Sequence, residues 1–512
     1  MTEGMLAIGD APLRLEAIRR VAAGGMAVAL APPARDRMAA ARAVVDRHLA
    51  EGRAVYGLTR GLGGQAQLTL PTETLAEFSR LTVLGRAHSV GPRLSRSAVR
   101  AAMLVRANGL AQGGAGVRPE LAEFLIALLN AGVHPEIPRI GSIGASDLCQ
   151  LAHLGLTVIG EGDAEFRGDR MPAGEALRRA GLAPFALAPK EGLALCSANS
   201  ATAGRGALAL ARARDLFLLA NLAAALSMEG FRANLSPLDP RVAAARPQPG
   251  QVETAQLLRQ LLAGSALERP DAARRLQDPL SFRCVSQVHG SLRAALAGAV
   301  AALQAELDGA GDNPLVLAAD DAILSNGNFH TPALALGFDM AALGLAQAAN
   351  LAVNRVARLM SGRFTDLPDR LTRELPPAAG LAPLMKTAEA LAAEIRHSAN
   401  PVAADQRASA DGIEDDTTNA PLAVAKFETA IERFGLLVAI ELLVAAEAVD
   451  HAKPARLGTG PAIAQRSLRE IVAPLDTDRP LGADVERIAE RLIDSGRLGE
   501  ELRALDIATG LD

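Results

Sequence analysis

Tryptophan is absent from this chain, tyrosine occurs once, at Tyr56, and aromatic residues make up only 3% of the sequence. The three cysteines, Cys149, Cys196 and Cys284, lie far apart and form no CxxC pair. This spacing excludes a disulfide framework and a cysteine zinc motif, and it fits a reducing compartment. The eight histidines form no HExxH or paired histidine–carboxylate spacing, so the sequence predicts no metal site.

No charge of one sign dominates, since 53 basic and 57 acidic residues leave a formal net charge of −4. A chain without a broad electrostatic field is a poor match for nucleic acid or a membrane surface as its main partner. The first ten residues lack the features of a secretory signal. Apolar runs at 216–228 and 436–449 are too short or too polar to span a bilayer, so they predict core helices. We therefore expect a cytoplasmic protein.

Alanine- and leucine-rich segments with helical periodicity dominate the chain. The longest of them lie at about 200–235, 283–310, 335–363, 382–399 and 420–451. Together they predict an all-α fold built on a bundle of long helices.

The domain organisation is predicted from where these segments begin and end. We expect an N-terminal domain at 1–200, a central long-helix bundle at 201–455 and C-terminal helices at 456–512. The proline-bearing stretch 234–270 is expected to connect helices, and the tail 457–512 is expected to form a pair of amphipathic helices.

Two glycine-rich loops are the candidate functional segments. Residues 55–64 carry Tyr56, and a glycine-rich loop with one polar aromatic residue suits an active-site lid, or else a turn with a capping tyrosine. Residues 139–148 contain two glycines, two serines and Asp147, and they open directly into a segment with the pattern of a buried helix. Free N–H groups at a helix start suit a negative group, whereas the alternative is a tight turn needed for packing.

Several polar groups are embedded in otherwise apolar segments, and buried charges need a partner or a ligand. Arg283 can bind a substrate carboxylate through its forked donors, although a helix-end salt bridge is as common for a lone arginine. Lys386 is one of only four lysines in an arginine-rich chain. It can act as a tunable proton donor or acceptor, or it can be an ordinary surface residue. The other groups of this kind are Arg86, His88, Ser197, Asn199, Gln277 and the acidic run Glu414-Asp415-Asp416.

The order of motifs over almost the whole chain resembles the histidine, phenylalanine and tyrosine ammonia-lyase family. The matching segments are Val55-Tyr56-Gly57, 106–111, 116–120, 129–135, Gly141-Ser142-Ile143-Gly144-Ala145-Ser146, 190–195, Gln277-Asp278-Pro279, Arg283-Cys284 with 287–290, Asp312-Asn313-Pro314-Leu315 and Gly327-Asn328-Phe329-His330. The resemblance implies an all-α homotetramer that acts on a small molecule. It also implies active sites that are each assembled from several subunits, with the tyrosine-bearing loop as a lid.

One departure from the family pattern changes the expected chemistry. Family members cyclise an Ala-Ser-Gly tripeptide into a methylidene-imidazolone electrophile, in which the glycine nitrogen attacks the alanine carbonyl. In this chain Ala145-Ser146 is followed by Asp147, which adds a Cβ and a charge to a crowded cyclisation. We therefore expect no prosthetic group and no other cofactor.

Other site positions of the family are also changed or retained. By resemblance, Arg86 replaces a histidine, Ser197 an asparagine, Leu280 a second tyrosine, and Thr59-Arg60 the Asn-Thr of the tyrosine loop. Glu414 matches the acid that faces the imidazole ring in histidine-specific members, and Lys386 aligns with the helix that lines the substrate pocket. The resemblance thus implies substrate contacts from Thr59, Arg60, Arg86, Asp147, Ser197, Gln277, Asn313, Phe329 and Glu414.

A chain without the electrophile needs a substrate that already carries a good leaving group, such as trimethylammonium. Elimination still requires a base for the β-proton and a cation that holds the carboxylate and stabilises developing negative charge. Tyr56 fits the base and Arg283 the carboxylate clamp. The stabiliser is expected to be Lys386 or Arg86, and Asp147, if it faces the pocket, is expected to attract the cationic leaving group.

These features resemble the branch of the family that contains ergothionase, which eliminates trimethylamine from the histidine betaine ergothioneine to give thiourocanate. Two alternatives remain open. One is a conventional histidine ammonia-lyase that gives urocanate after Ala-Ser-Asp has cyclised. The other is a catalytically silent homologue that binds ligands without turnover.

Overall fold

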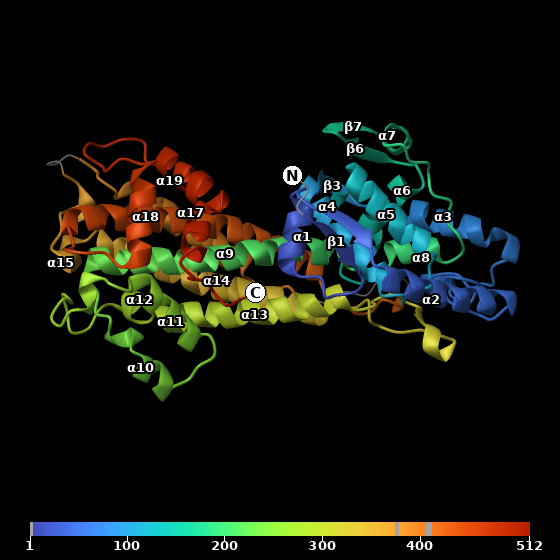
Figure 1. Ribbon diagram of the computed structural model, residues 1–512, viewed down its shortest axis with the longest axis horizontal. Coiled ribbons are helices and arrows are strands. Elements are labelled where there is room, and N and C mark those ends of the chain that lie inside the picture. Colours follow the sequence, from blue (N-terminus) through green and yellow to red (C-terminus); the bar gives the residue numbers. More distant parts are fainter. Residues whose placement is uncertain (1–3, 374–377, 406–411, 512) are drawn as a thin grey trace. The chain divides into compact units, whose positions relative to one another are not determined.

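The computed structural model of the protein describes residues 4–373, 378–405 and 412–511 (Figure 1). The chain divides into two compact units, each assembled from three stretches. Unit 1 comprises Met1–Ala211, Val300–Leu336 and Val402–Val424, and unit 2 comprises Arg212–Ala299, Gly337–Pro401 and Ala425–Asp512. This division differs from the three contiguous domains expected from the sequence, because periodicity along the chain does not show which segments pack together.

Four of the five unit boundaries fall inside long helices, which are α9 (Ser200–Phe231), α13 (Val285–Asp308), α14 (Pro332–Leu359) and α17 (Ala420–Ala452). Alanine and leucine, the residues that dominate them, have the highest helix propensities. Each helix lies close to a long segment predicted from periodicity, so the all-α class is confirmed.

Unit 1 also contains short strands that the sequence reading did not include. The pairs are β1 (Met5–Ile8) parallel to β2 (Ala27–Leu30), and, antiparallel, β3 (Val90–Arg93) with β5 (Pro138–Ile140) and β8 (Leu315–Leu317) with β9 (Ala322–Leu324). A three-stranded antiparallel sheet has the order β4 (Val133–Pro135), β6 (Asp163–Phe166) and β7 (Asp169–Pro172). Figure 1 shows β6 and β7 beside α7. Their two-residue loop, Arg167-Gly168, has φ of 55° and 93°, as a type I′ hairpin turn requires.

Shorter helices complete unit 1. They are α1 (Leu15–Ala22), α2 (Pro32–Ala50), α3 (Leu75–Arg86), α4 (Arg96–Ala111), α5 (Pro119–Ala131), α6 (Leu148–Val158), α7 (Ala173–Arg179) and α8 (Glu191–Cys196). Helix α6 follows the loop at 139–148, as its apolar spacing predicted.

The helices of unit 2 differ from the sequence-based prediction in two places, at 234–270 and in the tail at 457–512. Its shorter helices are α10 (Pro240–Ala245), α11 (Gln251–Leu262), α12 (Leu280–Arg283), α15 (Gly362–Thr365), α16 (Pro383–Ser398), α18 (Thr459–Arg469), α19 (Gly482–Ile488) and α20 (Arg497–Arg503). The presumed connection at 234–270 therefore holds α10 and α11, which lie side by side (Figure 1). The tail is not a helix pair, because Gly496, at φ 79°, separates the π-helical turn at Ala489–Asp494 from α20.

Helix α14 is long and apolar enough to cross a membrane by length and composition, with a mean hydropathy of 1.3 over its most apolar window. However, 56% of that window is buried within the protein. Core helices of helical bundles have the same composition, so packing accounts for this one without a membrane.

His134 lies in a buried polar cluster of unit 1. The Arg100 guanidinium lies 3.0 Å from Nε2 of His134 and donates to the Leu129 carbonyl at 3.0 Å. Since a guanidinium can only donate, this imidazole nitrogen must accept and carries no proton. Burial, together with the Arg100 charge, lowers the pKa of His134 to about 4.

We expect the free energy of unfolding to fall as the pH is lowered from about 6.5, the ordinary pKa of histidine, towards about 4. The unfolded chain takes up the proton near the ordinary pKa, whereas the folded protein keeps the imidazole neutral. The stabilisation is therefore complete above the unfolded pKa and is lost as the pH falls through the folded pKa, with a total on the order of 3 kcal/mol. Urea unfolding across this pH range measures it. His134→Gln should flatten the pH dependence, and an unchanged slope in this variant would contradict the assignment.

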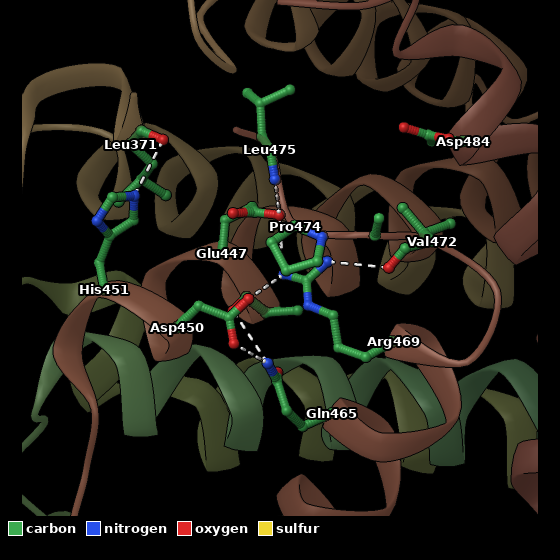
Figure 2. A network of polar contacts seen from close by, with 12 residues as sticks. Leu371, Glu447, Asp450, His451, Gln465, Arg469, Val472, Pro474, Leu475 and Asp484 are labelled. Carbon is green, nitrogen blue, oxygen red and sulfur yellow. Dashed lines mark hydrogen bonds and ion pairs between the residues drawn. The ribbon is translucent and has the colours of Figure 1, made fainter. Parts of the chain in front are cut away.

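Figure 2 shows Glu447 of α17 at the centre of a polar network in unit 2. This fully buried carboxylate accepts hydrogen bonds from Arg469 Nη2 at 2.8 Å, Arg373 Nη1 at 3.2 Å and the Leu475 N–H at 3.0 Å. Arg469 also pairs with Asp450 at 2.7 Å. The network therefore holds the segment that follows α18 against α17.

Glu447→Gln is expected to lower the free energy of unfolding by about 2 to 3 kcal/mol, because it removes the fully buried negative charge that pairs with both Arg469 and Arg373. Asp476 is a suitable control, since its side chain is 82% exposed and lies 3.8 Å from Arg373. Asp476→Asn should change the stability by less than about 0.5 kcal/mol. Denaturant unfolding compares the two, and equal effects would contradict the role of the buried network.

Candidate active site

The loop that precedes α6 has a conformation defined by hydrogen bonds within unit 1. Ser142 Oγ donates to the Ser146 carbonyl at 3.0 Å and accepts from the Gly144 N–H at 3.2 Å. Thr418 Oγ1 donates to the Gly144 carbonyl at 3.0 Å. Gly144 has φ of +92°, and a Cβ there would lie 2.0 Å from Thr418 Oγ1. Glycine is therefore required at this position by both the backbone and the available space.

Asp147 is buried, and its carboxylate faces the start of α9. Oδ2 accepts from the Thr202 N–H at 2.7 Å and Oδ1 accepts from Thr202 Oγ1 at 2.8 Å. Since N–H groups in the first turn of a helix have no intrahelical partner, this carboxylate caps α9. Burial raises the pKa of Asp147, and the bonds from Thr202 oppose that rise. Both carboxylate oxygens thus take part in the cap, and a contact of Asp147 with the leaving group of a substrate stays a prediction.

Residues 145–147 do not fit a cyclised tripeptide in this arrangement. Cyclisation would require the nitrogen of Asp147 to attack the Ala145 carbonyl carbon and to lose its proton. That N–H instead donates to the Ala198 carbonyl at 2.8 Å, while the side chain is held by Thr202. Ring formation would leave the Ala198 carbonyl without this donor and would strain the cap of α9.

Asp147→Ala is expected to lower the free energy of unfolding by about 2 kcal/mol, because the Thr202 N–H and hydroxyl lose their acceptor at the start of α9. Asp147→Asn keeps one oxygen as an acceptor for one of these two donors and should cost about half as much. Thermal and denaturant unfolding of both variants measures the difference. Wild-type stability in Asp147→Ala would contradict the capping role.

The loop that carries Phe329 packs against the same region of unit 1. Asn199 Nδ2 donates to the Phe329 carbonyl at 2.8 Å, and Ala145 forms an isolated antiparallel bridge with His330. His330 Nε2 lies 2.9 Å from Asp416 Oδ2. Three sequence-distant segments, at 142–147, 327–330 and 414–418, are therefore brought together. Glu414, Ser197 and Phe329, three expected substrate contacts, all lie on or next to these segments.

Asn313 is positioned by its own surroundings in unit 1. Its Oδ1 accepts from the Asn326 N–H at 3.1 Å. The neighbouring Asp312 forms a buried ion pair with Arg106 at 2.8 Å. Lys190 Nζ donates to the carbonyl of the following proline at 3.2 Å, and burial lowers the pKa of Lys190 to about 8. These buried charged groups bond to the residues on both sides of Asn313 and hold its loop in place.

The tyrosine-bearing loop is held mainly by its own residues. Tyr56 is half-buried, and its Oη accepts from the Gly63 N–H at 3.0 Å, a donor that suits a phenolate oxygen. Thr59 Oγ1 accepts from the Val55 N–H at 2.8 Å and donates to a nearby carbonyl. Arg60 Nη1 donates to the Gln67 carbonyl at 3.0 Å and to Thr69 Oγ1. Thr59 and Arg60 therefore shape the loop in this conformation, and substrate contacts from them stay a prediction.

Arg86 ends α3 and is half-buried. Burial raises the pKa of the Cys196 thiol to about 12, and the Arg86 charge opposes this rise. The positive charge of Arg86 is therefore felt at Cys196, the last residue of α8, immediately before Ser197. This placement keeps it a candidate for stabilising a negative charge in unit 1.

Gln277, Arg283 and Lys386 belong to unit 2. Arg283 Nη1 donates to Gln277 Oε1 at 2.7 Å, and Leu280, between them in sequence, is 59% exposed. This partner is an uncharged amide that orients the guanidinium, and the role of Arg283 as a carboxylate clamp stays a prediction. Lys386 lies on the exposed side of α16. Its role in a site therefore stays a prediction that depends on another subunit.

Two residues of this region, Thr202 and Glu306, were not singled out from the sequence. Thr202 gains its importance only through its contacts with Asp147. Glu306 of α13 has its pKa raised to about 7 by burial and by the charge of Asp147. The sequence signal that could have identified Glu306 is an acidic residue within an alanine- and leucine-rich helix. Within residues 4–373, 378–405 and 412–511, no group of three or more potential ligands is arranged to hold a metal ion.

Comparison with known proteins places this arrangement in a family. The family model for aromatic amino acid lyases matches residues 13–470. The histidine ammonia-lyase of Anaeromyxobacter dehalogenans is 41% identical over 497 residues, which cover 95% of this chain and 98% of that protein.

Solved structures give the same result. Ergothionase from Treponema denticola, in complex with desmethyl-ergothioneine sulfonic acid, superposes with a TM-score of 0.92 at 33% identity, over 97% of this chain and 99% of that one. Histidine ammonia-lyase from Trypanosoma cruzi superposes with a TM-score of 0.91 at 30% identity, over 99% and 97% of the two chains. The chain belongs to the aromatic amino acid lyase family and is a carbon–nitrogen lyase of its histidine ammonia-lyase group.

Proposed function

We propose that the protein eliminates trimethylamine from a histidine-derived betaine, with ergothioneine as substrate and thiourocanate as product, without a methylidene-imidazolone electrophile. The observation that carries the proposal is the state of Asp147, whose carboxylate caps α9 and whose N–H donates to Ala198. These contacts support a site without the electrophile, and an enzyme without it needs a substrate that carries its own good leaving group. The similarity to ergothionase supports the same conclusion.

The proposed reaction is a β-elimination. The Tyr56 phenolate takes the proton from the carbon next to the ring and becomes a neutral phenol. The electrons of that C–H bond form the new C=C bond, and the C–N bond breaks to release neutral trimethylamine. Arg283, oriented by Gln277, binds the carboxylate. Lys386 or Arg86 stabilises the negative charge that develops beside it, and Glu414 accepts an N–H of the ring.

We also propose a cytoplasmic homotetramer in which each active site takes residues from several subunits. Helix α14 supports this assembly, because Leu336, Met340 and Leu343 are 57%, 57% and 40% exposed at helical spacing on one face. An apolar stripe of this kind is suited to burial against other helices. Light scattering gives the mass in solution, and a monomer would contradict the proposal.

A conventional histidine ammonia-lyase is the second candidate, and the relative with 41% identity favours it. It requires Ala145, Ser146 and Asp147 to cyclise with loss of two waters. Intact mass spectrometry separates the candidates, because the first predicts the unmodified mass and the second predicts a mass lower by two waters.

Substrate screening tests the proposed function directly. The purified protein is incubated with ergothioneine, with hercynine, which has the trimethylammonium group but no thione, and with histidine. We expect trimethylamine and a conjugated product from ergothioneine and no ammonia from histidine. Release of ammonia from histidine together with the lower mass would establish the second candidate. Binding of ergothioneine without turnover would indicate a catalytically silent homologue.

A further inference from the structure

We propose that His330 and Asp416 form a positioning pair that joins the Phe329 loop to the segment carrying Glu414 and thereby sets the selectivity for the substrate ring. The inference rests on the proposed function, since it concerns how that site recognises its ring. It assigns a role to two residues outside the expected set of substrate contacts.

The His330 side of the pair is fixed by its loop. The His330 N–H donates to the Gly327 carbonyl at 2.9 Å, and the residue bridges Ala145. The preceding carbonyl, of Phe329, accepts from Asn199 Nδ2 at 2.8 Å. The imidazole therefore projects from a loop whose backbone is anchored on two sides, and it can serve as a fixed point for another segment.

The Asp416 side belongs to a segment with one anchored end. Thr418 Oγ1 donates to the Gly144 carbonyl at 3.0 Å, and Thr417 Oγ1 donates to the Asp405 carbonyl at 3.2 Å. Asp416 Oδ1 accepts from the Thr417 N–H at 3.0 Å, which leaves Oδ2 directed to His330 at 2.9 Å. The acid thus links this anchored end to the Phe329 loop.

Glu414 lies two residues before Asp416, and two residues span at most about 7 Å of chain. A contact that holds Asp416 therefore restricts where the Glu414 carboxylate can lie relative to Phe329. An aromatic side chain and a carboxylate at a fixed separation provide a face and an N–H acceptor for a planar heterocycle. A ring without an N–H, such as phenyl, gains nothing from this arrangement.

The solvent exposure of the His330 and Asp416 side chains allows a positioning role to be distinguished from a structural role. The His330 and Asp416 side chains are 23% and 59% exposed. A side-chain contact with this access to water contributes little to folding stability. Its loss should therefore leave the Tm nearly unchanged, while the loss of ring placement should appear in substrate binding.

The experiment is a double-mutant cycle on the full-length protein. His330→Ala, Asp416→Ala and the double variant are compared for KM, kcat, Tm and the Kd of ergothioneine by calorimetry. Each single variant should raise KM and Kd about tenfold, kcat should stay within about threefold, and the double variant should be no worse than either single one. Asp416→Asn, which still accepts a hydrogen bond, should show a smaller effect. Asp320→Ala, an exposed acid in the same unit, should match the wild type.

Unchanged KM and Kd in the single variants would overturn the proposal. If the fold-changes in KM and Kd of the two single variants multiply in the double variant, the two residues act independently. A large fall in Tm would show a structural role. Either result also overturns the proposal. If the wild-type protein binds ergothioneine without turnover, only the proposed function is overturned. The effects of the variants on ring binding are then compared through Kd, which needs no turnover. If histidine is the only compound converted, the same variants are compared through the KM for histidine. A wild-type protein that neither binds nor converts these compounds would overturn both.

Discussion

Tyr56→Phe is expected to lower kcat by about 10³-fold while the fold and the assembly persist, because it removes the oxygen that takes the β-proton. The change deletes one atom, whose hydrogen bond in the structure comes from the Gly63 N–H at 3.0 Å. Steady-state kinetics with ergothioneine, together with light scattering and Tm, measures the effect. Loss of activity with an intact assembly would be consistent with Tyr56 as the base.

The composition of the chain allows the same phenol to be observed directly. Tyr56 is the only tyrosine and tryptophan is absent, so the near-ultraviolet absorbance of phenolate reports on this one side chain. The pH dependence of kcat/KM should follow the same ionisation as the absorbance, and Tyr56→Phe should abolish the absorbance change. Turnover comparable to the wild type in Tyr56→Phe would refute the assignment of the base.

Lys386→Met is expected to lower kcat by about 10²-fold, because it removes a positive charge proposed to stabilise the carboxylate as negative charge develops beside it. Lys386→Arg separates two roles. Arginine keeps the charge but does not release a proton, so retained activity indicates electrostatic stabilisation and lost activity indicates proton transfer. Glu389→Gln, on the exposed surface of the same helix, is a control for changes of charge on α16.

An unchanged rate in Lys386→Met would show that Lys386 is an ordinary surface residue, as its exposure in the single chain allows. A lower rate that accompanies dissociation of the assembly would point to an interface role instead. Light scattering on the same preparations distinguishes these outcomes from a loss of catalysis.

The helical framework was predictable because alanine and leucine repeat at helical spacing over long stretches. Periodicity is a local property, so it located α9, α13, α14 and α17 without any knowledge of packing. It did not reveal the strands, such as β6 and β7, whose four residues each are too short for a pattern. It also did not reveal the two units, because each is assembled from stretches far apart in the sequence.

The motifs led to candidate site residues such as Tyr56, Arg283 and Phe329, but not to the contacts that hold them. Thr59 and Arg60 are predicted substrate contacts, and the structure adds that they bond to their own loop. The pairing of His330 with Asp416 joins residues 86 positions apart, a separation that no local pattern encodes.

The sequence by itself determined that an aspartate follows Ala145-Ser146 and that this chain departs there from the pattern of the family it resembles. Only the tertiary structure decided where the aspartate points. Its carboxylate lies against the first turn of α9, 55 residues away, because unpaired N–H groups at a helix start attract a negative group more strongly than an open loop does. In this structure the residue predicted to attract a cationic leaving group caps α9, and its N–H, which cyclisation would need, donates to the Ala198 carbonyl.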